Sequence, residues 1–90
     1  MITVQLPAQL ANFCLNTRTH IMEATTLSEV FKKFDEIAPM LRSQLFYPNG
    51  QLRQFVGLFL NDKQITLTEE EHNRLAQESQ LLIVLSVAGG

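Results

Sequence analysis

Residues 81–87 have the sequence LLIVLSV, an apolar run that only Ser86 interrupts. Short apolar runs rich in β-branched residues are typical of strands, and the lack of polar alternation predicts a central strand that is covered on at least one face. A central strand needs a partner along each edge. The other strands of the same sheet must therefore come from the residues that precede it.

Two strands are predicted near the N-terminus. Apolar and polar residues alternate over residues 2–6, and Pro7 ends this strand because proline has no N–H to donate to a ladder. Residues 18–24 alternate more weakly, with His20 and Met22 on one side. This pattern predicts a second strand.

One amphipathic helix is predicted over residues 27–38. Thr26 and Glu29 have the spacing of a capping box, which marks a helix start. Pro39 lacks a backbone donor and ends or kinks the helix, and residues 42–46 are expected to add an irregular turn. Apolar residues recur at helical spacing at Leu27, Val30, Phe31, Phe34, Ile37 and Leu41.

The second half of the chain predicts a hairpin. A sharp turn at residues 48–50 (Pro-Asn-Gly) precedes an apolar strand over residues 54–60. Asn61-Asp62-Lys63 supplies the turn chemistry that leads into a short strand over residues 64–67. A second possible capping box over residues 68–71 opens a short helical turn before the last strand.

The order of these elements predicts an α+β domain with the β-grasp (ubiquitin-like) arrangement. In this arrangement one main helix packs on one face of a mixed sheet, and the first and last strands are parallel neighbours. We expect the domain to span residues 1–87 and residues 88–90 to form a flexible tail. The predicted core consists of Ile2, Val4, Leu6, Val30, Phe34, Ile37, Val56, Leu58, Ile83, Leu85 and Val87.

Composition limits the classes of partner. The 90 residues carry a formal charge of −2, and no basic run is longer than Lys32-Lys33, so the sequence has no electrostatic footprint for nucleic acid or an anionic membrane. No apolar segment is long enough to span a membrane, and the N-terminus has no basic region of the signal-peptide kind. We therefore expect a cytoplasmic protein whose partners are proteins.

Side chains that could carry chemistry are few. Cys14 is the single cysteine, so it cannot form an internal disulfide, and no basic cluster near it in sequence would lower its pKa. It is interpreted as a packing residue. Cys14, His20, Met22 and His72 do not have metal-ligand spacing, and no metal site is predicted. These observations favour a protein that is not itself an enzyme.

The sequence Val87-Ala88-Gly89-Gly90 is the strongest local signal for function. Glycine has no Cβ, so such a segment can pass through a narrow channel and approach a partner's catalytic groups closely. Four extended residues span roughly 13 Å, enough to carry the Gly90 carboxylate into another protein. A free carboxylate is inert toward nucleophiles, so a separate enzyme would have to activate it. The simpler alternative is a frayed chain end.

Two segments carry a family resemblance. Residues 52–62 (LRQFVGLFLND) and residues 82–90 (LIVLSVAGG) resemble the ubiquitin-like sulfur carriers of the ThiS/MoaD family. The most similar members are the carrier of cysteine biosynthesis and the small subunit of molybdopterin synthase. Gly57 stands where the family commonly has Asn, and residues 77–80 replace its usual Asp-Gly turn. These departures affect the subfamily more than the chemistry of the tail.

The resemblance implies a function for the tail. Gly90 would be adenylated with ATP by an E1-like enzyme, converted to a thiocarboxylate, and used as a protein-bound sulfide donor in the biosynthesis of cysteine or another sulfur-containing metabolite. The chain would then be a protein cosubstrate that binds no cofactor, because the activating enzyme uses the ATP. Its partners would be that enzyme and a sulfur-acceptor biosynthetic enzyme.

The strand over residues 54–60 predicts a docking surface. If Val56, Leu58 and Leu60 face the helix, Phe55 and Phe59 lie on the open side of the sheet, near Leu82 and Val84 of the last strand. An exposed apolar patch is typical of an interaction site. Val87 and Ala88 would extend this contact into the tail. Alternatively, one or both rings are covered by residues 42–52 or are ordinary surface aromatics.

Three other functions remain open from the sequence. The chain could be a protein modifier whose Gly90 ends in an isopeptide bond to a lysine, because this function needs the same activated tail. It could be the small subunit of molybdopterin synthase. It could also be a passive ubiquitin-like interaction domain in which Gly89 and Gly90 are incidental.

Overall fold

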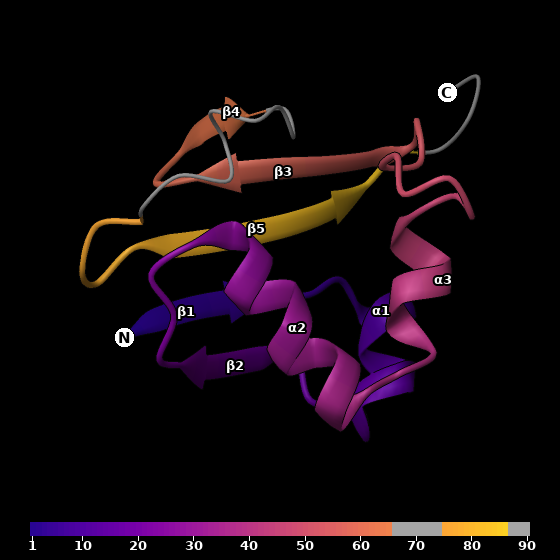
Figure 1. Cartoon of the computed structure of the whole chain (residues 1–90), viewed down its shortest axis with the longest axis horizontal. Coiled ribbons are helices and arrows are strands. Elements are labelled where there is room, and N and C mark those ends of the chain that lie inside the picture. The colour runs from indigo at the N-terminus through magenta and orange to yellow at the C-terminus, as the bar shows by residue number, and fades with distance from the viewer. Residues whose placement is uncertain (66–74, 87–90) are drawn as a thin grey trace.

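The computed structural model describes residues 1–65 and 75–86, which form a mixed sheet with helices on one face and at one end (Figure 1). The sheet has five strands in the order β2-β1-β5-β3-β4. The strands are β1 Ile2–Gln5, β2 Thr19–Met22, β3 Val56–Leu60, β4 Lys63–Ile65 and β5 Gln80–Leu85. The helices are α1 Ala8–Ala11, α2 Leu27–Ile37 and α3 Leu41–Leu45, with a 3₁₀ turn over Asn12–Cys14. The predicted β-grasp arrangement is confirmed.

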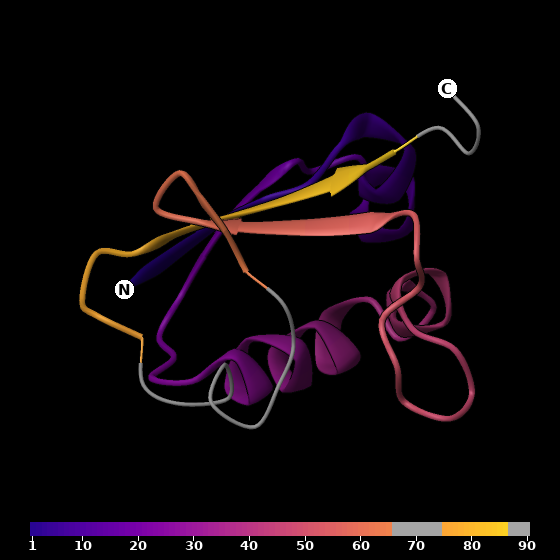
Figure 2. The ribbon, with the colours of Figure 1, turned by 90° about the horizontal axis from the view of Figure 1, so that it is seen from above.

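Strand β5 is central, as its apolar sequence predicts. Its register with β1 is parallel and ends at the pair Gln5↔Leu82. Its register with β3 is antiparallel and extends to the pair Val56↔Leu85. Figure 2 shows α2 lying along one side of this sheet, with the N-terminal coil that contains α1 at one end of it.

The start of α2 follows the predicted cap with one shift. The Thr26 hydroxyl accepts a hydrogen bond from the Glu29 N–H at 3.2 Å. The Glu29 carboxylate accepts from the Thr25 N–H at 2.8 Å, one residue earlier than in a standard capping box, and also from the Thr25 hydroxyl. The N–H groups of Thr25 and Glu29, at the start of the helix, thus both gain side-chain acceptors.

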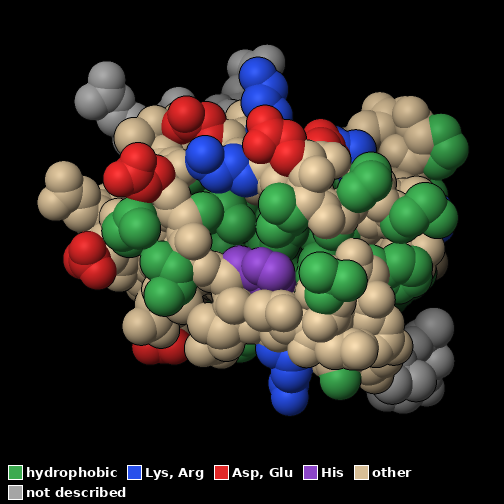
Figure 3. Space-filling view, turned by 90° about the horizontal axis from the view of Figure 1, so that it is seen from below, with side chains coloured by type: hydrophobic (Ala, Val, Ile, Leu, Met, Phe, Trp, Pro, Cys, Tyr) green, Lys and Arg blue, Asp and Glu red, His purple; other side chains and the backbone are tan. Residues whose placement is uncertain are grey.

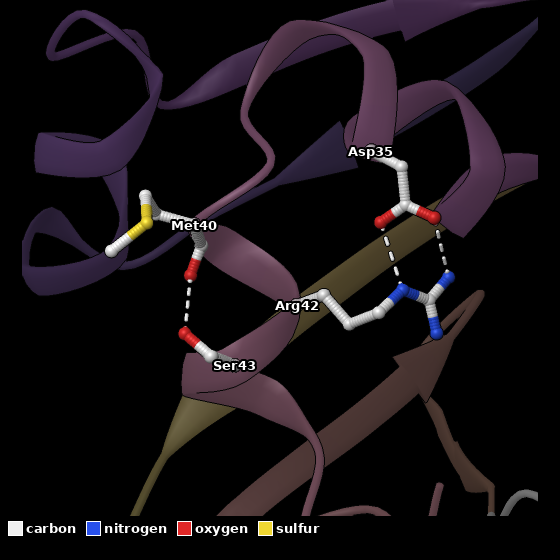
Figure 4. Close-up of polar contacts among 4 residues, drawn as sticks. All are labelled: Asp35, Met40, Arg42 and Ser43. Carbon is white, nitrogen blue, oxygen red and sulfur yellow. Dashed lines mark hydrogen bonds and ion pairs between the residues drawn. The ribbon is translucent and has the colours of Figure 1, made fainter. Parts of the chain in front are cut away.

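The segment after α2 is more regular than predicted. Residues 41–45 form the helix α3, not an irregular turn. The Arg42 guanidinium donates two hydrogen bonds to the Asp35 carboxylate, at 2.8 and 2.9 Å, and Ser43 donates one to the Met40 carbonyl at 2.8 Å (Figure 4). The hydrogen bonds to Asp35 raise the pKa of Arg42. Because both partners are exposed, this pair orients α3 against α2 but adds little stability.

The core lies between α2 and the sheet and confirms most of the predicted set. Leu58, Ile83, Val4 and Val30 are each 0% exposed. Half-buried Leu85 packs against the core, and Val87 lies outside the described residues. Buried residues that the sequence did not assign to the core include Leu10, Leu45 and Leu81.

Ile37 corrects the predicted core. Its side chain is 56% exposed, whereas Ala38 is 2% exposed. Ala38 lies four residues after the buried Phe34 and donates its N–H to the Phe34 carbonyl at 2.7 Å, so it continues the inward stripe of α2. Ile37 lies one position before Ala38 on the helix, and its side chain therefore faces solvent.

The turns match the predicted chemistry. Asn61 and Asp62 have φ angles of 51° and 70°, the left-handed pair that a two-residue hairpin requires. Gly50 has φ 89°, and its N–H donates to the Tyr47 carbonyl at 2.9 Å. The predicted strand over residues 64–67 is observed as Lys63–Ile65, and its last two residues, like the predicted capping box at 68–71, lie outside the described residues.

Leu58→Ala should lower the free energy of unfolding by about 2–5 kcal/mol, because it removes a fully buried side chain and leaves a cavity under α2. Ile37→Ala is the matched control and should change it by less than about 0.5 kcal/mol. Urea denaturation followed by circular dichroism measures both. Equal losses in the two variants would contradict the face assignments.

The stability of the protein should fall in acid, because protonation of Glu29 weakens the hydrogen bonds at the start of α2. The hydroxyl and N–H of Thr25 donate to the Glu29 carboxylate and lower its pKa, so folding favours the ionised form. A group with a lowered folded pKa stabilises fully above its unfolded pKa, about 4.3, and loses this contribution as pH falls through the folded value. Glu29→Gln should therefore flatten the acid side of the curve of stability against pH.

Thr25→Val, which removes the hydroxyl donor, should flatten the same part of the curve less strongly. Thermal melts between about pH 7 and pH 2 measure this dependence. Parallel curves for the native protein and Glu29→Gln would show that the hydrogen bonds do not favour the ionised form.

Candidate functional site

The base of the predicted tail is held by the sheet. The Ser86 N–H donates to the Phe55 carbonyl at 2.7 Å, which extends the β3–β5 ladder one residue past the end of β5. Ser86 is exposed and is the last described residue. Val87, Ala88, Gly89 and Gly90 lie outside the described residues, so their assignment as a site stays a prediction.

The open face of the sheet carries three of the predicted docking residues. The register places Phe59 beside Leu82, and Gly57 beside Val84. Leu82 is 41% exposed, while Phe59 and Val84 are half-buried. Because Leu58 and Ile83 point toward α2, their neighbours along each strand must point the other way. We call Phe59, Leu82 and Val84 the open-face patch.

The absence of a side chain at Gly57 leaves room for the Val84 side chain in the open-face patch. A Cβ built on Gly57 would lie 2.9 Å from the Val84 Cγ2 atom and 3.8 Å from the Phe59 Cε1 atom. The Val84 side chain therefore covers the backbone of Gly57, next to the Phe59 ring. A larger residue at position 57 would have to displace Val84. This contact is a physical reason for glycine at the position where the resembling family commonly has Asn.

Phe55 corrects the predicted patch. It is half-buried and packs against the hydrophobic core, so it does not join the open-face patch. The Val56 N–H donates to the Arg53 carbonyl at 3.0 Å, which places Phe55 in a turn before β3 begins. Strand alternation, from which the prediction was made, does not apply to a residue in a turn.

One exposed residue on the open face was not singled out from the sequence. Ile21 on β2 is 64% exposed and lies opposite Thr3, which shares its face with Gln5 and Leu82. Thr3 and Gln5 separate it from the open-face patch. The alternation of residues 18–24 contained this signal, because it placed Ile21 opposite to the buried side of Met22.

The remaining candidate side chains have packing roles. Cys14 is buried, and this burial raises the pKa of its thiol, which disfavours the reactive thiolate. The His20 ring packs edge-to-face against Phe34, with 5.2 Å between the ring centres. Within residues 1–65 and 75–86, no three side chains of His, Cys, Asp or Glu come together as a metal site. His72 lies outside these ranges.

The described surface shows no single-sign charge patch in the view of Figure 3. Acidic and basic side chains are interspersed over the upper part of this face, and hydrophobic side chains reach the surface between the remaining polar groups. None of the described helices is long and apolar enough to cross a membrane.

Comparisons with solved structures place this arrangement among known folds. The crystal structure of SAMP1 from Haloferax volcanii matches with a TM-score of 0.79 and 21% identity, covering 99% of this chain and 98% of that one. The chain has the fold of SAMP1. Mycobacterium tuberculosis CysO matches with a TM-score of 0.83 and 20% identity over 97% of this chain and 100% of that one.

A third match comes from a complex. A chain of the Amycolatopsis orientalis BexX/CysO complex matches with a TM-score of 0.84 and 19% identity, and each chain is covered completely. In sequence comparisons, no family model and no curated protein matches the chain. The fold likeness therefore rests on structure, at about one identical residue in five.

Proposed function

We propose that this chain is a sulfur-carrier protein whose reactive group is the carboxylate of Gly90. The observation that carries the proposal is the combination of fold and sequence at the end of β5. The fold matches CysO and SAMP1 along nearly the whole of both chains, and the central strand leads through Ser86 to Gly89 and Gly90. The Ser86 N–H is hydrogen-bonded to the Phe55 carbonyl, so the base of the proposed tail is held on the domain.

The chemistry needs no side chain from the carrier. A separate E1-like enzyme joins the Gly90 carboxylate to the AMP part of ATP and releases pyrophosphate. A sulfide equivalent then displaces AMP and leaves a thiocarboxylate. The thiocarboxylate sulfur is transferred at an acceptor biosynthetic enzyme, and water attacks the acyl carbon to restore the carboxylate. The chain is a protein cosubstrate in this scheme, and the activating enzyme binds the ATP. Cysteine or another sulfur-containing metabolite is the proposed product.

Protein partners are supported by one comparison and one surface. The Amycolatopsis structure is a complex of CysO with BexX, so a protein of this fold can dock on another protein. The open-face patch offers apolar anchors for such docking, and interface energy concentrates in a few aromatic or apolar residues. We assign this surface to the activating enzyme or the sulfur acceptor.

A protein modifier is the second candidate function. The name of SAMP1, small archaeal modifier protein 1, favours it, because this chain shares the SAMP1 fold. The activated Gly90 would then form an isopeptide bond with a lysine of a target protein. Both functions begin with the same adenylation and differ only in the nucleophile that displaces AMP.

Loading of Gly90 tests the proposal. Incubation with an E1-like enzyme, ATP and a sulfur donor should raise the intact mass by the exchange of one oxygen for one sulfur. Deletion of Gly90 should abolish this gain without unfolding the domain, because Gly90 lies beyond the described sheet. Gly89→Phe should also block loading, since a side chain would obstruct the channel that the tail must enter.

Three outcomes of this experiment separate the alternatives. Attachment to lysines of other proteins, with no thiocarboxylate, would favour the modifier. Sulfur loading of the Gly90-deleted protein would reject Gly90 as the reactive residue. Failure of several E1-like enzymes to change the mass would favour a passive interaction domain.

Phe59→Ala should weaken binding to the activating enzyme by about 1–3 kcal/mol, because it removes the aromatic member of the open-face patch. Its free energy of unfolding should change by less than about 1 kcal/mol, since Phe59 does not pack against the core. Ile21→Ala is the matched control on the same face and should leave binding unchanged. Isothermal titration calorimetry and thermal melts measure the two quantities. A large loss of stability with normal affinity would place Phe59 in the core.

A further inference from the structure

Strand β5 continues past the point where β1 leaves it. The β1–β5 register ends at Gln5↔Leu82, whereas β5 stays paired with β3 up to Leu85 and, through the Ser86 N–H, one residue further. One edge of residues 83–85 is therefore open among the described residues.

The backbone hydrogen bonds of the sheet show which groups face this open edge. The Ser86 N–H donates to Phe55 and the Asn61 N–H donates to Gln80, so even-numbered residues of β5 bond to β3. Odd-numbered residues face β1, as the bond from the Thr3 N–H to the Ser79 carbonyl shows. The odd-numbered groups beyond the end of the β1 ladder include the Ile83 carbonyl and the Leu85 N–H.

Pro7 ends the ladder for two reasons. If β1 continued past Gln5, residue 7 would be its next residue facing β5 and would donate its N–H to the Ile83 carbonyl. Proline has no N–H to donate. It would also accept from the Leu85 N–H, but its carbonyl already accepts from Leu10 and Ala11 of α1, each at 3.0 Å. Both β5 groups lack a ladder partner within the described residues.

A groove with an anchored cation borders this edge. It has a volume of about 480 Å³ and is lined by the end of β1, Arg18, Thr19 and residues 82–85. The Arg18 Nε donates to the Leu6 carbonyl at 3.2 Å, which holds the guanidinium beside the groove. Arg18 forms no ion pair with any described residue. Within the described part of the chain, the groove thus combines a free backbone acceptor, a free backbone donor and a positive charge.

We propose that an extended, acidic segment of the activating enzyme adds to this edge as an extra strand. Its backbone hydrogen-bonds to the Ile83 carbonyl and the Leu85 N–H, and a carboxylate binds Arg18. At about 3.3 Å per residue, three residues of the partner are enough to reach both backbone groups. The inference rests on the proposed function, and it places the partner beside Ser86, where the chain departs toward Gly90.

A peptide titration tests the edge on the chain alone. The probe is a capped peptide of alternating valine and glutamate, added to the ¹⁵N-labelled protein at millimolar concentration, with a valine–glutamine peptide as its neutral control. Saturable shifts should appear at the Leu85 amide and the Arg18 Nε–H. The neutral peptide should bind roughly tenfold more weakly, because it loses a charge-assisted hydrogen bond.

Two variants separate the two parts of the site. Arg18→Gln should lower affinity for the acidic peptide roughly tenfold, whereas Lys63→Gln, the same charge change on β4, should leave it unchanged. Leu85→Pro removes the N–H on the open edge without removing a bond to β3, and it should weaken both peptides. The amide spectrum reports whether each variant keeps its fold. Shifts confined to the open-face patch, no saturable shifts, or self-association of the chain through this edge would each overturn the inference.

The loading assay separates this inference from the proposed function. If the activating enzyme loads Arg18→Gln and Leu85→Pro as fast as the native chain, it does not use the edge, and the inference fails while the carrier function stands. If the peptide binds but Gly90 is never activated, the carrier function fails and the edge remains a binding site. Loading at least about tenfold slower in both variants, with normal loading of Lys63→Gln, supports the inference.

Discussion

The pairing of β5 with β1 on one side and β3 on the other is the interaction on which the rest of the structure depends. It joins the N-terminal strands to the β3–β4 hairpin, and without it the chain would contain two small, separate ladders. Two-stranded ladders are marginally stable in water, whereas a sheet of five strands under a helix can bury an apolar face. The side chains of Leu81 and Ile83 supply the centre of that face.

The same strand determines where the functional groups lie. Strand alternation buries Ile83 under α2 and leaves Leu82 and Val84 on the other face, next to Phe59. Its direction carries the chain to Ser86, whose N–H is hydrogen-bonded to the carbonyl of Phe55, the residue just before β3. One strand thus serves as the centre of the core, as part of the open-face patch and as the support for the base of the tail.

This arrangement fits a protein that presents a group to other enzymes. The described side chains form a packed domain in which Cys14 is buried and the His20 ring packs edge-to-face against Phe34. In the proposed scheme, the catalytic groups belong to the partners, and this chain provides a rigid body, an apolar surface and a backbone terminus. The open edge beside Arg18 would let one partner recognise the body close to the point where the tail begins.

The sequence by itself determined the order of the strands and the main helix, the hairpin turn and most of the core, because alternation, helical spacing and turn residues act over a few neighbouring positions. It predicted the Thr26–Glu29 cap, a hairpin turn over residues 61–63, and the burial of Leu58. It also provided Gly89 and Gly90, on which the proposed chemistry rests. Only the tertiary structure decided the positions where several elements compete for one space. Ala38 takes the inward place that helical spacing also allowed for Ile37, and Phe55 packs against the core because β3 begins only at Val56. The open edge of β5 exists because the Pro7 carbonyl bonds to α1 while β5 continues along β3. These outcomes depend on contacts between residues distant in sequence, and local patterns contain no information on which contact is the more stable.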